Sequence, residues 1–245
     1  MNRPSPLDNV RIVLSHTSHA GNIGATARAM KTMGLSVLYL VNPKSFPSNE
    51  ADVRASNARD ILEQARVVGC LEEALQDCVL AAALTARPRD LAHRTLAARE
   101  AAGELFHHAR HAPVALVFGR ESSGLTTPEI GKCQITVHIP ANPDYASLNL
   151  AAAVQLMAYE LRMASTVTMP AASQQSVYRL ASFQEIELFY SHLEQAMIHS
   201  GFLDPAQPKR LMQRIRRLFA RAQLEKEEVN ILRGIISALE KHRSK

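Results

Sequence analysis

Residues 10–41 read VRIVLSHTSHAGNIGATARAMKTMGLSVLYLV, and their pattern indicates the fold class. Val10–Ser15 and Val37–Val41 are short runs that are mostly apolar on both faces, as parallel strands covered by helices are. Residues 23–33 between them have the pattern of a helix. A strand, a helix and a second strand in this order predict a parallel βαβ unit.

The same alternation continues to about residue 163. Further strands are expected at 65–68, 79–85, Val114–Phe118 and 134–139. Helices are expected at 71–76, 97–109 and 147–163. The sequence therefore predicts an α/β domain with a mainly parallel sheet.

The composition excludes several classes of protein. The chain has 245 residues, of which 47% are hydrophobic and 21% charged, and these values are typical of a folded globular protein. Its N-terminus is polar and interrupted by Pro4 and Pro6, and its apolar runs are far shorter than the roughly 20 residues that a bilayer requires. Three cysteines without zinc-type spacing indicate neither a metal site nor a disulfide framework. We expect a cytoplasmic protein without membrane or metal partners.

A second region follows a change in composition. Residues 165–178 contain no charged side chain and are rich in Ser, Thr, Ala and Gln, as linkers are. Ser182 and Glu185 then form a capping box that predicts a helix ending near Gly201. Two more helices are expected, one after Pro208 and one over 225–242. The predicted organisation is an α/β domain over 1–164, a linker over 165–178 and a small all-helical domain over 179–245.

Three expected strand-to-helix loops are rich in Gly, Asn and Ser: 16–28, 118–125 and 142–150. Parallel α/β folds bind ligands in such loops, beyond the carboxyl ends of the strands. Each feature taken alone also has a purely structural explanation, since the glycines fit turns and Ser147 fits a helix N-cap. The chain has no Gly-x-Gly-x-x-Gly, P-loop or Gly-x-Ser-x-Gly motif. Dinucleotide binding of the Rossmann type, P-loop chemistry and a nucleophile elbow are therefore not expected.

The motifs Asn22-x-Gly24-x-x-Ala27-Arg28, 118–125 and Ser147-Leu148-Asn149-Leu150 resemble, in this order, those of the SPOUT-class RNA ribose 2′-O-methyltransferases. The whole chain, helical tail included, is similar to the bacterial subgroup that methylates the pyrimidine at tRNA position 32. The resemblance implies an α/β fold with a C-terminal trefoil knot, which is an exception to the rule against threaded chains. It also implies a homodimer, a tRNA substrate and the cofactor S-adenosyl-L-methionine.

The resemblance further implies which residues form the site. Arg28 matches the family's catalytic arginine, and the other positions near the reacting centre are Glu121, Ser147 and Asn149. The implied cofactor residues are Leu84, Thr85, Ala86, Gly119, Ile139, Ala146, Ser147 and Leu148. An arginine does not lose its proton below about pH 12, so we expect Arg28 to bind a phosphate and stabilise the developing alkoxide.

The distribution of charge predicts where RNA binds. The net charge is only +5, but residues 205–223 hold six basic residues and no acidic one. A helix would align four arginines in one stripe, with an apolar stripe of Leu211, Ile215, Leu218 and Ala222 beside it. A helix face that carries only positive charges favours contact with phosphates. The expected RNA-binding residues are Arg28, Arg87, Lys209, Arg210, Arg214, Arg217 and Arg221, with Arg54 and Arg89 as extensions of the track.

Other functions remain open from the residues alone. They are 2′-O-methylation of another RNA such as ribosomal RNA, a non-catalytic RNA-binding adaptor on the same fold, and a general nucleotide-binding enzyme. The chain contains no Trp and only 5% aromatic residues, so we expect RNA to be held through its backbone and shape.

Overall fold

One parallel sheet organises the first two thirds of the chain in the computed structural model, which describes residues 5–86, 94–166 and 179–243. Its strand order is β3-β2-β1-β6-β4-β7-β5, and every neighbouring pair is parallel. The strands are β1 (Val10–Ser15), β2 (Val37–Val41), β3 (Arg66–Val68), β4 (Leu80–Leu84), β5 (Arg94–Ala97), β6 (Val114–Phe118) and β7 (Ile135–His138). The predicted α/β class with a mainly parallel sheet is confirmed.

Strand β5 was missed in the sequence because it lies at the edge of the sheet. Its residues include Arg94 and Thr95, both exposed, so it lacks the apolar pattern of a central strand. The central strands β1 and β6 are buried along their whole length. All carboxyl ends point to one edge of the sheet because the pairing is parallel throughout.

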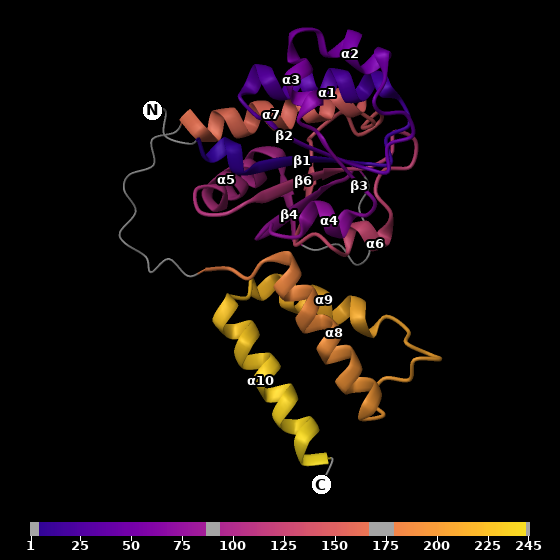
Figure 1. The fold of residues 1–245 in the computed structure, drawn as a ribbon, viewed down its shortest axis with the longest axis vertical. Coiled ribbons are helices and arrows are strands. Elements are labelled where there is room, and N and C mark those ends of the chain that lie inside the picture. Colours follow the sequence, from indigo (N-terminus) through magenta and orange to yellow (C-terminus); the bar gives the residue numbers. More distant parts are fainter. Residues whose placement is uncertain (1–4, 87–93, 167–178, 244–245) are drawn as a thin grey trace.

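Helices cover both faces of the sheet (Figure 1). The face with the larger core is covered by α1 (Ala20–Met33), α2 (Asn49–Ala55), α3 (Arg59–Glu63), α5 (Ala98–Ala109) and α7 (Leu150–Thr166). On the opposite face lie α4 (Leu71–Leu75) and α6 (Thr127–Ile130). Two 3-10 turns, Pro6–Asn9 and Ser56–Ala58, complete the order. The sequence did not predict the short helices α2, α3 and α6, which have seven, five and four residues, although it predicted the equally short α4.

Helix α7 differs from its predicted start and end. It begins at Leu150, because Asn149 Oδ1 accepts hydrogen bonds from the backbone N–H groups of Ala151 and Ala152 at 3.0 and 3.3 Å. Asn149, not Ser147, therefore caps this helix. Its last residue, Thr166, lies two residues inside the predicted linker, and residues 167–178 of that linker lie outside the described residues.

The C-terminal region contains α8 (Phe183–His199), α9 (Leu211–Ala222) and α10 (Lys226–Arg243). The predicted capping box is present: Ser182 Oγ accepts from the Glu185 N–H at 3.3 Å, and Glu185 Oε2 accepts from the Ser182 N–H at 2.9 Å. The three helices enclose a small core in which the rings of Phe189 and Phe219 meet edge to face at 5.0 Å.

The prediction of which side of α9 is buried is wrong, because the helix is rotated about its axis relative to the predicted orientation. Met212, Ile215 and Phe219 pack into the core, whereas Leu218 is 53% exposed and Ala222 is also exposed. The cause is the aromatic cluster of α8, since Phe219 lies next to both Phe189 and Tyr190 and turns α9 toward them.

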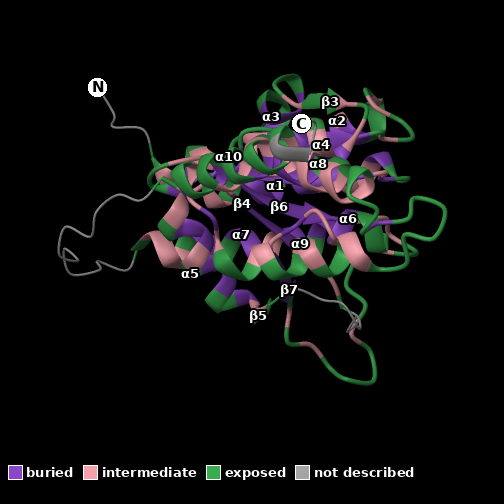
Figure 2. Cartoon of the chain, turned by 90° about the horizontal axis from the view of Figure 1, so that it is seen from below, coloured by how far each residue is buried: buried purple, intermediate pink, exposed green. Residues whose placement is uncertain are grey.

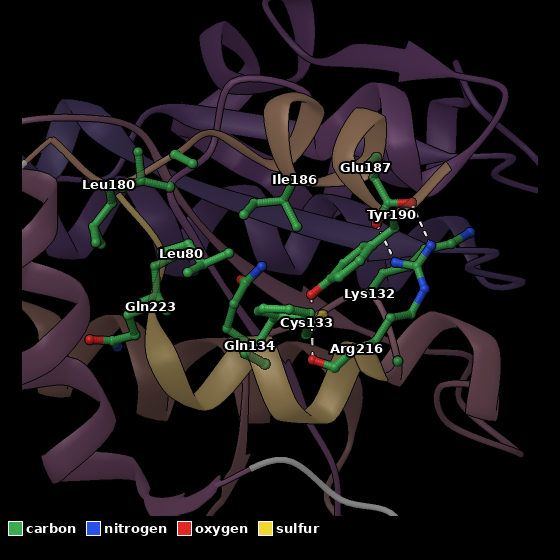
Figure 3. A pocket seen from close by; sticks show the side chains of 16 residues that line it. Leu80, Lys132, Cys133, Gln134, Leu180, Ile186, Glu187, Tyr190, Arg216 and Gln223 are labelled. Carbon is green, nitrogen blue, oxygen red and sulfur yellow. Dashed lines mark hydrogen bonds and ion pairs between the residues drawn. The ribbon is translucent and has the colours of Figure 1, made fainter. Parts of the chain in front are cut away.

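The helical region is joined to the sheet domain through the first turn of α8. Phe183 is only 4% exposed and belongs to the core of the sheet domain, and its N–H donates to Cys78 O at 2.8 Å. A small cavity of about 40 Å³ lies between the two parts (Figure 3). It is bordered by Leu80 at the start of β4, by Gln134 just before β7, and by Tyr190 and Arg216 from the helices. The helices thus contact the amino edge of the sheet.

Candidate active site

A cavity of about 270 Å³ opens at the opposite edge, beyond the carboxyl ends of β4, β6 and β7. All eight residues that the resemblance assigned to the cofactor line it: Leu84, Thr85, Ala86, Gly119, Ile139, Ala146, Ser147 and Leu148. The loop 119–125 forms another part of the wall. Segments that are more than 50 residues apart in sequence therefore meet in one hollow, as expected for a ligand site of an open α/β sheet.

The loop after β6 has a tight geometry that requires glycine. Arg120 and Gly124 pair with each other through two backbone hydrogen bonds of 3.3 and 2.9 Å, and Gly124 has φ +69°. A Cβ on Gly119 would lie 2.2 Å from both Gly124 C and Leu125 N. Backbone atoms cannot yield as a flexible side chain can, so only glycine fits at position 119.

Glu121 fastens this loop to the start of α1. Its Oε1 accepts hydrogen bonds from the His19 N–H and Asn22 Nδ2 at 3.2 and 3.0 Å. Its Oε2 accepts from the N–H and hydroxyl of Ser18 at 3.1 and 2.9 Å. Burial alone would raise the pKa of Glu121, but the hydrogen bonds from Asn22 and Ser18 lower it to about 2. The carboxylate is therefore ionised, and each of its oxygens accepts two hydrogen bonds.

Asn149 extends the same network to the third loop. While its Oδ1 caps α7, its Nδ2 donates to Asn22 Oδ1 at 3.0 Å. Asn22 thereby connects Glu121 with Asn149. The loops after β1, β6 and β7 are held together by these three side chains. Ser147, two residues earlier, is exposed at the cavity wall.

A buried carboxylate that the sequence analysis missed lies behind the loop 119–125. Glu129 accepts from Ser15 Oγ at 2.5 Å, from Arg120 Nη1 at 3.0 Å and from the Thr126 N–H at 2.6 Å. Burial would raise the pKa of Glu129, but these hydrogen bonds lower it to about 2. The signal was present in the sequence, because Thr126 and Glu129 form a capping box with Pro128 between them.

Arg28 lies outside the cavity of its own chain. It is exposed on α1, and it makes no hydrogen bond or ion pair with the residues that the structure describes. Gly24, in the same motif, has a structural role: a Cβ there would lie 2.0 Å from Ala51 O, so glycine lets α2 pack directly on α1. The motif thus contains a glycine that allows close helix packing, Gly24, and an asparagine that links Glu121 with Asn149, Asn22. Its arginine, Arg28, has no partner in the described structure.

The predicted basic residues of α9 lie on exposed parts of the chain, and the exposed residues of this helix are green in Figure 2. Five of its basic residues are exposed and have no acidic partner within the described part of the chain: Lys209, Arg210, Arg214, Arg217 and Arg221. Lys209 and Arg210 precede the first residue of the helix. Arg216 is different, since it pairs with Glu187 and lies over the Tyr190 ring at 4.5 Å (Figure 3). Arg87 lies outside the described residues.

The described part of the chain contains neither a metal-binding cluster nor a membrane-spanning helix. Within residues 5–86, 94–166 and 179–243, no group of three or more His, Cys, Asp or Glu side chains is arranged to hold a metal ion. None of the helices in those ranges is both long and apolar enough to cross a membrane.

Comparison with known proteins identifies the family. Residues 9–159 match the model of the SpoU rRNA Methylase family, and residues 184–245 match the C-terminal domain of the tRNA methyltransferase TrmJ. The chain is 48% identical to the tRNA (cytidine/uridine/adenosine-2′-O-)-methyltransferase TrmJ of Pseudomonas aeruginosa, over 96% of this chain and 95% of that protein. It is 50% identical to the tRNA (cytidine/uridine-2′-O-)-methyltransferase TrmJ of Pectobacterium atrosepticum, over 96% and 98% of the two chains.

A solved structure agrees with both matches. The crystal structure of TrmJ from Z. mobilis ZM4 superposes with a TM-score of 0.83 at 32% identity, covering 94% of this chain and 98% of that one. The likeness therefore includes the helical region as well as the sheet domain. The chain belongs to the SpoU methylase family and, within it, to the TrmJ proteins.

Proposed function

We propose that this chain transfers a methyl group from S-adenosylmethionine to the ribose 2′-hydroxyl of the cytidine or uridine at position 32 of tRNA. The observation that carries the proposal is the meeting of all eight expected cofactor residues in one cavity, beside a helix that presents Arg28. The names of the TrmJ relatives support tRNA and the 2′-oxygen. We also infer the trefoil knot, a cytoplasmic location and a homodimer from the family.

The cavity has the chemical character that the cofactor requires. Leu84, Ile139 and Leu148 offer apolar contacts suited to an adenine ring. The loop 119–125 lines the cavity and folds back on itself so tightly that a Cβ at Gly119 has no room. Hydroxyl groups of Thr85 and Ser147 border the same space. These residues would hold S-adenosylmethionine, which supplies an electrophilic methyl carbon attached to a positively charged sulfur.

The protein must align the ribose 2′-oxygen with the methyl carbon and stabilise the oxygen as its proton leaves. Arg28 is suited to the second task, because its guanidinium is free to bind the neighbouring phosphate and the developing negative charge. Glu121 is not suited to accept the proton. The hydrogen bonds that its carboxylate accepts from Ser18, His19 and Asn22 lower its pKa to about 2, so it holds a proton poorly. We therefore assign Glu121 and Asn149 to positioning.

The homodimer has support from one surface of the sheet domain. Leu156 and Tyr159 of α7 are exposed large apolar residues one helical turn apart, and Leu148 of the cavity loop is exposed as well. A second copy that covers this face would also enclose the mouth of the cavity. Light scattering at micromolar concentration tests the dimer, and Leu156→Glu is expected to shift it toward monomer.

The decisive experiment is methyl transfer from labelled cofactor into total tRNA, followed by mapping of the modified nucleotide. Defined transcripts with C, U or A at position 32 then give the base preference. If the labelled methyl group is found at another tRNA position or in ribosomal RNA, the proposed target is wrong and that nucleotide is the target instead. Failure to bind S-adenosylmethionine in calorimetry would favour an adaptor, and activity on small nucleotides without RNA binding would favour a general nucleotide enzyme.

A further inference from the structure

Arg54 is an exposed residue of α2 whose stem lies against the glycines of α1. A Cβ built on Gly24 would lie 2.9 Å from Arg54 Cβ, and one built on Gly21 would lie 3.6 Å from Arg54 Cγ. Arg54 has no hydrogen-bond or ion-pair partner among the residues that the structure describes. Its aliphatic part is therefore held in place while its guanidinium stays free.

The two contacts also give the direction of the side chain. The Cβ of Arg54 is next to Gly24, and its Cγ is next to Gly21, which is one turn closer to the start of α1. That start lies at the active-site edge, where Ser18 and His19 donate to Glu121. The stem of Arg54 therefore runs along α1 toward the edge at which the cavity opens.

Arg28 lies on the same side of α1. It follows Gly24 by four residues, and residues at this spacing share one helix face. Side chains of an α-helix lean toward its N-terminus, so Arg28 also leans toward the active-site edge. Glu50 is an acidic residue beside Gly21, since its Oε1 would be 2.6 Å from a Cβ there, and it forms no ion pair with either arginine in the described structure.

We propose that Arg54 binds a phosphate of the RNA strand next to the methylated nucleotide, alongside Arg28. A guanidinium whose stem is already fixed loses little entropy on binding, and its planar fork matches two oxygens of a phosphodiester. Arg54 is thus a positioning residue for the substrate and does not touch the cofactor. This inference rests on the proposed function, because it requires that the substrate be RNA.

The test separates the charge of Arg54 from its packing. Arg54→Met keeps the stem against Gly21 and Gly24 but removes the charge, and Arg54→Lys restores a charge. Arg59→Met is the matched control, since Arg59 is an exposed, unpaired arginine of the neighbouring helix α3 in the described structure. We expect Arg54→Met to raise KM and Kd for tRNA by about tenfold near 0.1 M salt. The slope of log K against log salt should fall by about 0.9.

Other quantities should stay constant if Arg54 only binds RNA. The Kd for S-adenosylmethionine, the melting temperature and kcat at saturating tRNA should be those of the wild type, and Arg54→Lys should recover part of the affinity. The inference is overturned if Arg54→Met binds tRNA with wild-type affinity and salt slope, or if Arg59→Met weakens binding equally. A wild-type enzyme that binds tRNA through Arg54 but methylates no RNA would instead overturn the proposed function.

Discussion

Glu121 accepts a hydrogen bond from the side chain of Asn22 at 3.0 Å, across a separation of 99 residues in the chain. This bond joins the loop after β6, which borders the cavity, to the helix that presents Arg28. Asn22 in turn accepts from Asn149 at the start of α7. The loop 119–125, α1 and α7 are therefore parts of one hydrogen-bonded unit, and disturbing one member should affect the others.

Replacing Glu121 with Gln should disrupt that unit. One oxygen becomes an NH₂ group, which would face the N–H donors of Ser18 and His19 or the amide of Asn22. We expect kcat/KM to fall by about 10²-fold, comparable to the loss of one important polar contact at a site. Methyl-transfer kinetics with each substrate varied in turn would measure it. A variant with wild-type kinetics would show that the carboxylate is dispensable.

Replacing Gly119 with Ala should abolish cofactor binding. The added Cβ would lie 2.2 Å from the backbone of Gly124 and Leu125, so the loop has to change its conformation. Calorimetry should show no saturable binding of S-adenosylmethionine. Gly103→Ala on α5 is the matched control, because a Cβ there meets nothing within 4 Å. It should keep full activity and gain about 0.5–1 kcal/mol in the free energy of unfolding from its higher helix propensity.

The two site carboxylates should make the protein sensitive to acid. Hydrogen bonds lower the pKa of Glu121 and of Glu129 from 4.5 to about 2 in the folded state. Their contribution to stability is thus complete above the unfolded value of about 4.5 and is lost as pH falls toward 2. Glu129→Gln should be less stable than the wild type at pH 7, but should lose less stability between pH 7 and pH 3. Urea unfolding at both pH values measures this, and equal losses would contradict the assignment.

The sequence predicted the central strands and the long helices better than the edge strand β5 and the orientation of α9. Five strands and the longer helices were recognised because buried parallel strands are nearly continuous apolar runs, as in β1 and β6, whereas β3 was predicted as a buried strand but is largely exposed. Strand β5 was missed since Arg94 and Thr95 are polar and largely exposed at the edge of the sheet. The rotation of α9 was also wrong, because the aromatic partners that fix it come from α8, about 30 residues before Phe219 in the chain.

The motifs predicted which residues meet, but not what each one contacts. Loops after parallel strands must lie at one edge, so the loops could be placed together from their order, but it was the family resemblance that assigned the individual cavity residues. Glu121 accepts hydrogen bonds from Ser18, His19 and Asn22. These bonds depend on the distance between two loops, and no local sequence pattern contains that distance. Glu129 was overlooked for the same reason, although its capping box with Thr126 was visible.

Arg28→Lys tests whether the arginine acts as a positive charge. If it stabilises a phosphate and a developing alkoxide, lysine should keep at least about one tenth of kcat, whereas Arg28→Ala should lose about 10²–10³-fold. Single-turnover rates at saturating tRNA measure the chemical step directly. Collapse of Arg28→Lys with unchanged tRNA affinity would defeat the charge model and require the planar, two-pronged geometry of the guanidinium.

The arginines of α9 should fall into two groups by their surroundings. Arg214 and Arg217 are exposed and have no acidic partner in the described structure, so replacing both with Ala should lower the salt slope of tRNA binding by about 1.8, the value for two lost phosphate contacts. Lys241→Ala on α10 is the control cation of the same region and should leave the slope unchanged. Arg216→Ala should instead lower the melting temperature, because Arg216 pairs with Glu187 and packs on Tyr190. Equal salt slopes for the double variant and the wild type would show that RNA follows another surface.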